Sequence, residues 1–392
     1  MPASIPHNSL PVCRVPLLDV VRDGDLLRDE ILTAVAEIYD TGRFVNGPHC
    51  QAFERAIAET CETKFAVGCA SGSDALLLAL MAIDTRAGDE VILPSFTFFA
   101  TASAVTRLGA TPVFVGIDPV TFNICPAAIE AAVTEQTKAI MPVHLFGQCA
   151  DMDTIGRIAE KNSLHVIEDA AQAIGARHGD RAAGSMGDIG CFSFYPTKNL
   201  GGVGDGGILT TSNEQLADRL RLLASHGMNP RYYHSEVGIN SRLDTIQAAA
   251  LHIKLKRLAD WTARRQQNAA RYAELFVVAG LANTVTLPDA SADTAHAWNQ
   301  FTIRVPNGQR DALRAHLADA NVGSEIYYPV PLHQQKCFAS LPHVTTDLPE
   351  TERASAEVLS LPIFPGLTQE EQGYVVDQTA AFFAAGQHRL AS

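Results

Sequence analysis

The chain alternates between two hydrophobic patterns from about residue 15 onward. Apolar residues recur at helical spacing over several segments, which predicts amphipathic helices that cover a common core. Short, nearly continuous apolar runs lie between them, and such runs are typical of strands buried on both faces. Helices are expected at 26–44, 49–61, 72–83, 97–109, 126–134, 151–162 and 213–227, and strands at 64–69, 89–95, 111–118, 138–146, 164–170 and 207–211. This alternation predicts an α/β fold whose large domain has a mostly parallel central sheet flanked by helices.

A second, smaller domain is expected after the large one. One long helix, beginning near Asp244 and continuing to about residue 276, leads away from the predicted sheet. The segments 297–306 and 308–328 combine a strand pattern with a helix pattern, as in a small α+β domain. The predicted organisation is an N-terminal tail at 1–14, a large domain at 15–250 and a small C-terminal domain at 251–392.

Composition narrows the possible functions. A net charge of −13 repels a polyanion, so nucleic-acid binding is not expected. No apolar run approaches the roughly 20 residues of a membrane span, and the N-terminus has no signal-peptide pattern, so we expect a cytoplasmic protein without a membrane partner. The eight cysteines include no CxxC pair and the sequence has no HExxH motif, so neither disulfides nor a bound metal are expected.

A turn of small residues suggests a phosphate site. Ser71, Gly72 and Ser73 stand where the strand at 64–69 meets an apolar helix. Free amides at a helix N-terminus, together with a hydroxyl, can bind a phosphate. An ordinary N-cap, with Ser73 or Asp74 satisfying the first helical turn, explains the same residues.

Two carboxylates follow directly after a strand that should be buried. Glu168 and Asp169 stand at the edge of the sheet where open α/β folds bind ligands. Alternation along the strand should send the two side chains to opposite sides, and one of them can instead cap the following helix. A buried carboxylate requires a cationic or hydrogen-bonding partner, and a protonated pyridine nitrogen would satisfy Asp169.

Lys198 has an unusual position for a charged residue. It follows the apolar run 191–197 and precedes a glycine-rich loop, whereas most lysines are solvated surface residues. In a partly desolvated pocket a lysine has a lowered pKa and provides a neutral amine that can attack an aldehyde. The loop at 202–207 matches GxGxxG, but a strand follows it where a dinucleotide site requires a helix, so that site is not favoured.

Phosphate-binding amides, an acid for a ring nitrogen and a lysine for an aldehyde together describe a site for pyridoxal 5′-phosphate. The sequence resembles the DegT/StrS group of nucleotide-sugar aminotransferases, within the fold-type I pyridoxal phosphate enzymes. The resemblance extends from about residue 15 almost to the C-terminus. Its motifs include ASGSDALLLAL (70–80), IEDAAQAIGA (167–176), SFYPTKNLGGVGDGG (193–207) and GINSRLDTIQAAAL (238–251).

This resemblance implies a role for each matching residue. Lys198 is similar to the lysine that bonds covalently to the cofactor, and Asp169 is similar to the acid that pairs with the pyridine nitrogen. Gln172 matches an amide near the cofactor's phenolic oxygen, and Phe98 matches a ring that stacks on the cofactor. The residues that match phosphate ligands are Gly72, Ser73, Ser193 and Asn240, the last reaching across from a second subunit. The family pattern thus implies a homodimer with active sites shared between its subunits.

The resemblance also implies a reaction. It is the ping-pong transfer of an amino group from L-glutamate to a nucleotide-diphosphate keto sugar, with pyridoxamine 5′-phosphate as the intermediate form of the cofactor. Tyr327 and His333, in YYPVPLHQQ, resemble the loop of members that act on a C3 ketone, and a C4 ketone is the alternative. Arg242 either holds a substrate anion or forms an ion pair with a neighbour such as Asp244.

Three other functions share parts of this pattern. A pyridoxamine phosphate-dependent sugar dehydratase of the family would have histidine in place of Lys198. A non-catalytic regulatory relative would be expected to lose Lys198 or Asp169. An aromatic-forming synthase that acts on a carbocycle would keep the same motifs. Because this chain has both residues, the aminotransferase is favoured over the dehydratase and the regulatory relative, and the synthase stays an alternative.

Overall fold

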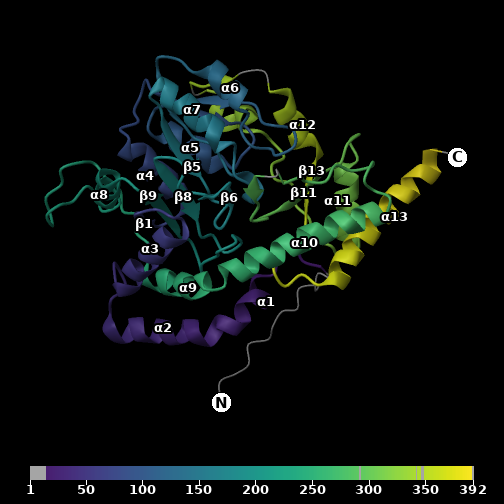
Figure 1. Cartoon of the computed structure of the whole chain (residues 1–392), viewed down its shortest axis with the longest axis horizontal. Helices are drawn as coiled ribbons and strands as arrows, with labels where there is room; N and C mark the ends of the chain where they lie inside the picture. Colours follow the sequence, from purple (N-terminus) through teal and green to yellow (C-terminus); the bar gives the residue numbers. More distant parts are fainter. Residues whose placement is uncertain (1–14, 291–292, 341, 346–347, 391–392) are drawn as a thin grey trace.

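The centre of the molecule is an eight-stranded sheet with the order β1-β9-β8-β5-β4-β2-β3-β12 (Figure 1). The structure is a computed structural model that describes residues 15–290, 293–340, 342–345 and 348–390, so the tail predicted at 1–14 lies outside it. β9 is antiparallel to both of its neighbours, and the other adjacent strands are parallel, which confirms the mostly parallel sheet. The strands are β1 (Phe65–Cys69), β2 (Glu90–Pro94), β3 (Thr111–Val115), β4 (Thr137–Ile140), β5 (His165–Asp169), β8 (Ile189–Ser193), β9 (Gly207–Thr211) and β12 (Val344–Thr345).

Helices cover both faces of this sheet, as its apolar strands require. Successive residues of β5 point to opposite faces, so that Ile167 packs in one core and Val166 in another. On the face of Ile167 lie α4 (Gly72–Ala82), α5 (Phe99–Arg107) and α8 (Glu214–Leu223). On the other face lie α3 (Pro48–Thr60), α6 (Pro126–Ala132), α7 (Met152–Asn162) and α9 (Thr245–Leu255). Because of this alternation, the side chain of Asp169 points to the same face as Ile167, and the side chain of Glu168 points to the same face as Val166.

Several chain segments meet at one edge of the sheet. β1, β5 and β8 run in the same direction, so Cys69, Asp169 and Ser193 end their strands at this edge. β9 runs the opposite way and begins there, with Gly207 paired to both Cys69 and Ser193. The fold therefore brings three features to the same edge of the sheet. They are the turn at 71–73 that is predicted to bind phosphate (the phosphate turn), the Asp169 carboxylate and the loop that carries Lys198.

The helix expected from about residue 244 is divided into two. α9 ends at Leu255, and α10 (Leu258–Val278) begins after a short turn. The two parts have different packing partners: α9 contacts α3 and α2 (Arg28–Thr41), whereas α10 contacts α13 (Gln369–Leu390). In Figure 1 they extend one after the other from beneath the large sheet toward the smaller C-terminal one. The change of partner explains why one amphipathic pattern contains a break without proline or glycine.

The smaller part of the molecule has its own antiparallel strand pair, β11 (Phe301–Arg304) and β13 (Val358–Leu361), and its own helices. The segment between β11 and β13 is less separate from the large sheet than expected, because β12 pairs with β3 and Phe338 packs in the core below that sheet. The two-domain division remains a prediction. The elements are β11 (Phe301–Arg304), α11 (Arg310–Asp319), η3 (Leu332–Gln334), η4 (Lys336–Phe338), α12 (Pro349–Glu357), β13 (Val358–Leu361) and α13 (Gln369–Leu390).

The remaining elements are short or peripheral. No helix in the described ranges has both the length and the apolar character to cross a membrane. The cytoplasmic location remains a prediction. The elements are α1 (Val20–Gly24), η1 (Asp25–Leu27), α2 (Arg28–Thr41), η2 (Leu145–Gly147), β6 (Arg177–His178), β7 (Arg181–Ala182) and β10 (Thr294–Ala295).

Candidate active site

Asp169 is buried at the end of β5, on the face of the sheet covered by α5. The Thr101 hydroxyl, on α5, donates a hydrogen bond to Asp169 Oδ2 (2.8 Å), and the Ala171 N–H donates to Oδ1 (3.3 Å). Burial raises the pKa of the Asp169 carboxyl, and these two donors oppose that effect. Both donors are neutral, so a cation placed beside this carboxylate would stabilise its charged form.

Lys198 lies on the loop after β8, and its side chain is half-buried. Burial lowers the pKa of its amine to about 8, and the negative charge of Asp169 acts in the opposite direction. The two groups are thus close enough to interact electrostatically. At pH 7.5 a lysine with its ordinary pKa is about 0.1% neutral, whereas a pKa of about 8 leaves roughly a quarter of the amine neutral. The neutral amine is the form that attacks a carbonyl carbon.

The phosphate turn and the end of β8 form a narrow cradle. A Cβ on Gly72 would lie 2.6 Å from the Cβ of Ser193, so only glycine fits at this position. The N-cap of α4 is Ser71, whose hydroxyl accepts the Asp74 N–H (3.1 Å). The alternative that Ser73 or Asp74 caps the helix is therefore wrong. Ser73 is exposed in the first turn of α4, and its hydroxyl remains available to a ligand.

The glycines after Lys198 allow close approach of backbone to backbone. A Cβ on Gly201 would collide with the carbonyl oxygen of Pro196, and a Cβ on Gly207 would collide with that of Ser71. The loop is therefore folded tightly on itself and packed directly against the phosphate turn. β9 starts at Gly207, as expected from the strand pattern that argued against a dinucleotide site.

An amide and two aromatic rings stand near the carboxylate. Gln172 is buried; its Oε1 accepts the Phe146 N–H (2.6 Å) and its Nε2 donates to the Tyr328 hydroxyl (3.2 Å). The ring centroid of Phe98 lies 6.1 Å from that of Tyr328, and Phe98 is 56% exposed. Sequence reasoning singled out Tyr327 and missed Tyr328. The only signal in the sequence was that two tyrosines stand next to each other, at 327 and 328.

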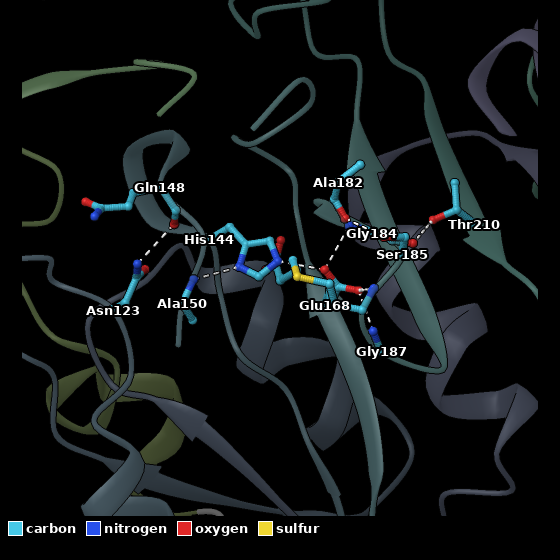
Figure 2. A network of polar contacts seen from close by, with 12 residues as sticks. Asn123, His144, Gln148, Ala150, Glu168, Ala182, Gly184, Ser185, Gly187 and Thr210 are labelled. Atoms are coloured by element: carbon cyan, nitrogen blue, oxygen red, sulfur yellow. Dashed lines mark hydrogen bonds and ion pairs between the residues drawn. The ribbon is translucent and has the colours of Figure 1, made fainter. Parts of the chain in front are cut away.

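On the opposite face, Glu168 belongs to a fully satisfied buried network (Figure 2). His144 Nδ1 accepts the Ala150 N–H (3.2 Å), so the ring proton lies on Nε2, which donates to Glu168 Oε2 (2.8 Å). The backbone N–H of His144 also donates to Asp169 O (3.0 Å). The other donors to the carboxylate are the N–H groups of Gly184 (2.7 Å), Met186 (2.7 Å) and Gly187 (2.6 Å). The network anchors the backbone directly beside Asp169.

His333 and Tyr327 are brought to the same sheet edge. His333 Nδ1 is 2.7 Å from Oγ of Ser95, the residue that follows β2, and Nε2 is 3.4 Å from Glu352 Oε1. The Ser95 hydroxyl also accepts the His333 N–H (3.2 Å), so His333 is held on both sides of its ring. Tyr327 is half-buried, with its ring centroid 5.8 Å from that of Tyr328.

Two predicted site residues lie apart from this group. Arg242 lines a cavity of about 270 Å³ together with Arg221 and Glu54. Within the described ranges it forms no ion pair, which argues against the pairing with Asp244. Asn240 is exposed on the surface. In the part of the chain that the structure covers, no group of three His, Cys, Asp or Glu side chains could hold a metal ion.

Comparisons with known proteins identify the family. Residues 25–380 match the model of the DegT/DnrJ/EryC1/StrS aminotransferase family. The chain belongs to this family. A pleiotropic regulatory protein of Geobacillus stearothermophilus is 47% identical over 94% of this chain and 98% of its own length. A UDP-N-acetyl-3-dehydro-alpha-D-glucosamine 3-aminotransferase of Acidithiobacillus ferrooxidans is 47% identical over 91% of this chain and 95% of its own length.

The solved structures show the same fold. DesV from S. venezuelae, in complex with a ketimine intermediate, superposes with a TM-score of 0.90 at 42% identity, covering 95% of this chain and 99% of DesV. The expected fold-type I aminotransferase architecture is thereby confirmed. The chain is a sugar aminotransferase of the DegT/DnrJ/EryC1/StrS family, whose aminotransferases use pyridoxal 5′-phosphate.

The residues present fit this cofactor. The cradle at Gly72 and Ser193 offers helix amides and hydroxyls to a phosphate. Asp169 is a buried carboxylate whose bonded donors are all neutral, which suits a cationic ring nitrogen. Lys198 supplies an amine with a lowered pKa. We propose these residue roles from the geometry, since each group matches one chemical feature of the cofactor.

Proposed function

We propose that this aminotransferase moves the amino group of L-glutamate to the C3 ketone of a nucleotide-diphosphate sugar. The observation that carries the proposal is the meeting of Lys198, Asp169 and the Gly72 cradle at one sheet edge. The choice of C3 is supported by the Acidithiobacillus relative, which is named as a 3-aminotransferase, and by the position of His333 at the same edge.

Each residue has a definite task in this proposal. When bound, pyridoxal 5′-phosphate supplies an aldehyde that carries the amino group and a ring that accepts electrons when the donor loses a proton. Lys198 Nζ, neutral in part of the molecules near pH 8, accepts that proton and later returns it. The Asp169 carboxylate keeps a positive charge beside it, and Thr101 keeps that carboxylate oriented. The hydroxyls of Ser73 and Ser193 hold the phosphate.

The direct experiment runs the reaction in reverse, because amino sugar nucleotides are chemically more stable in solution than keto sugar nucleotides. The purified enzyme is incubated with 2-oxoglutarate and a panel of 3-amino and 4-amino sugar nucleotides, and glutamate formation is measured. We expect glutamate from 3-amino substrates and none from the matched Lys198→Ala variant. Glutamate from 4-amino substrates alone would contradict the proposed regiochemistry.

We also propose that the active enzyme is a homodimer with shared sites. Large apolar side chains are exposed on α2 and on the loop before Asn240, including Tyr39, Tyr232 and Tyr233, and such surfaces mark interfaces. Asn240 itself is exposed, as expected of a residue that serves the partner's site. Mixing Lys198→Ala with Asn240→Ala subunits should restore activity, because one site of each mixed dimer then has both residues intact. No restoration in proven mixed dimers would contradict the sharing.

The regulatory name of the Geobacillus relative raises the non-catalytic alternative. This chain has both Lys198 and Asp169, and the structure places them within electrostatic reach of each other. A protein without catalytic function has no need to keep a lysine in a site that lowers the pKa of its amine. The same lysine argues against the dehydratase, whose family members have histidine there.

A further inference from the structure

A short segment before β11, residues 296–299, contacts the active-site loops from outside the large sheet. The Ala297 N–H donates to Gly147 O (2.8 Å), and the Asn299 N–H donates to Phe146 O (2.8 Å). Gly147 has a φ of 102°, and a Cβ there would lie 2.9 Å from the nitrogen of Trp298, so this approach requires glycine. The segment thus holds the loop whose Phe146 N–H binds the Gln172 side chain.

The same segment also binds the residue next to Lys198. Asn199 is 6% exposed; its Nδ2 donates to Ala297 O (2.7 Å), and its Oδ1 accepts from Asn299 Nδ2 (2.7 Å). Asn299 is equally buried, at 6%. Two side-chain amides therefore connect the loop of Lys198 to the segment that holds the loop of Gln172.

Contacts on its far side make this segment rigid. The ring of His296 stacks on that of Trp298, with centroids 3.9 Å apart and an angle of 6° between planes. His296 Nδ1 accepts the Trp298 N–H (2.8 Å), and Trp298 has a φ of 48° in the left-handed region. From α10, Arg265 donates to Trp298 O (3.0 Å) and Gln266 donates to His296 O (3.1 Å). A strained residue that is held by this many contacts is a fixed support.

The Asn199–Asn299 pair costs free energy that an apolar pair would not, because within the described ranges it leaves a buried polar atom without a partner. Asn299 Oδ1 is buried and, among the described residues, has no hydrogen-bond partner. A leucine has the same number of side-chain heavy atoms and would remove this unsatisfied oxygen, but it would leave Asn199 Oδ1 without the N–H that it now accepts. An amide at this position therefore indicates that the direction of its N–H group, rather than its volume, is needed.

We propose that Asn299 is a positioning residue, which through Asn199 fixes the Lys198 loop in register with the loop that holds Gln172. The cofactor-binding lysine and the amide expected beside the cofactor then belong to one rigid unit built on the segment 296–299. The inference rests on the proposed role of Lys198. It goes beyond that role in assigning the lysine's orientation to a residue of the C-terminal part of the chain.

The test compares Asn299→Leu with a matched control, Gln266→Leu, in the holoenzyme. Asn299→Leu removes an amide of the segment 296–299 that binds the Lys198 loop, whereas Gln266→Leu removes an amide of α10 that binds the same segment and does not reach this loop. Hydrogen exchange of peptides covering 195–202 should be about tenfold faster in Asn299→Leu and unchanged in the control, since one buried hydrogen bond to the loop is lost. The pH midpoint of the absorbance of the bound cofactor should also shift in Asn299→Leu only.

A double-variant comparison isolates the route through Asn199. If Asn299 acts through Asn199, then adding Asn299→Leu to Asn199→Ala should change neither readout further. The proposal would be overturned if Asn299→Leu had the hydrogen exchange and the pH midpoint of the wild type, or if Gln266→Leu changed both by the same amount. If Asn299→Leu does not fold, Asn299→Ala takes its place in the comparison. The exchange experiment involves no sugar, so its failure is distinct from failure of the proposed reaction.

Discussion

Removing the Thr101 hydroxyl tests whether Asp169 is held as a buried carboxylate. Thr101→Val keeps the shape of a fully buried side chain and deletes its 2.8 Å hydrogen bond to Asp169 Oδ2. A hydrogen bond to a charged group contributes about 1.5–3 kcal/mol. For a chain of 392 residues, 1 kcal/mol corresponds to roughly 1 °C in Tm. At a pH above the pKa of Asp169 we therefore expect the Tm of the cofactor-free Thr101→Val protein to be about 2–3 °C lower than that of the wild type.

The effect should depend on pH with a definite sign. Burial already raises the pKa of Asp169 in the folded protein, and the variant raises it further because the hydroxyl favours the charged form. The unfolded carboxyl ionises near its usual pKa of about 4, so a carboxyl whose pKa is raised by folding loses stability as pH rises from that value to the folded pKa. Because the variant raises the folded pKa further, this loss continues to a higher pH than in the wild type. The deficit of Thr101→Val should thus be larger at pH 8 than at pH 5.

The assay is thermal unfolding followed by intrinsic fluorescence at pH 5, 6, 7 and 8. Thr302→Val is the matched control, because its buried hydroxyl lies 2.8 Å from Oγ of Ser360, a neutral partner. The control should lose about 1 °C at every pH. Equal, pH-independent losses in the two variants would refute the reasoning, since Asp169 would then behave as an uncharged group.

Three further predictions concern the same site. Glu168→Gln should lower the free energy of unfolding by about 3 kcal/mol or more, measured by urea denaturation, because one amide N–H would face donors that now bind a carboxylate; a loss below about 1 kcal/mol would show that the network is not needed. Gly72→Ala should weaken pyridoxal phosphate binding at least about tenfold in an absorbance titration, because its Cβ would meet Ser193 at 2.6 Å; unchanged affinity would place the phosphate elsewhere. Asp169→Asn should lower the pH midpoint for capture of the cofactor by Lys198 from about 8, because a charge that raises the pKa of the amine is removed; a higher midpoint would contradict the electrostatic account.

Much of the site follows from local pattern and sheet geometry. Asp169 could be placed at a ligand-binding edge because apolar runs predicted a parallel sheet, and ends of parallel strands share an edge. The role of Gly207 required the structure, since its need for close approach depends on a strand, β9, that runs antiparallel between β1 and β8. The N-cap of α4 is Ser71 and not Ser73. The sequence could not distinguish them, because two serines two positions apart are equally suited to cap a helix.

Other features depend on contacts between distant segments. The division of the helix after Leu255 follows from a change of packing partner, which no local pattern encodes. Tyr328 contacts Gln172 across a separation of 156 residues, and Asn299 contacts Asn199 across 100. Such pairs are invisible without the fold. A resemblance to known motifs can indicate where the cofactor binds, but not which buried amides hold its lysine in place.

The central claim is that Lys198 bonds covalently to pyridoxal 5′-phosphate, and reductive trapping tests it most directly. The holoenzyme is treated with borohydride, digested, and its peptides are examined by mass spectrometry. The account predicts a single pyridoxyl phosphate adduct, on the peptide that contains Lys198, and its loss in Lys198→Ala. An adduct on another lysine, or none in an enzyme that still transfers amino groups, would contradict the account.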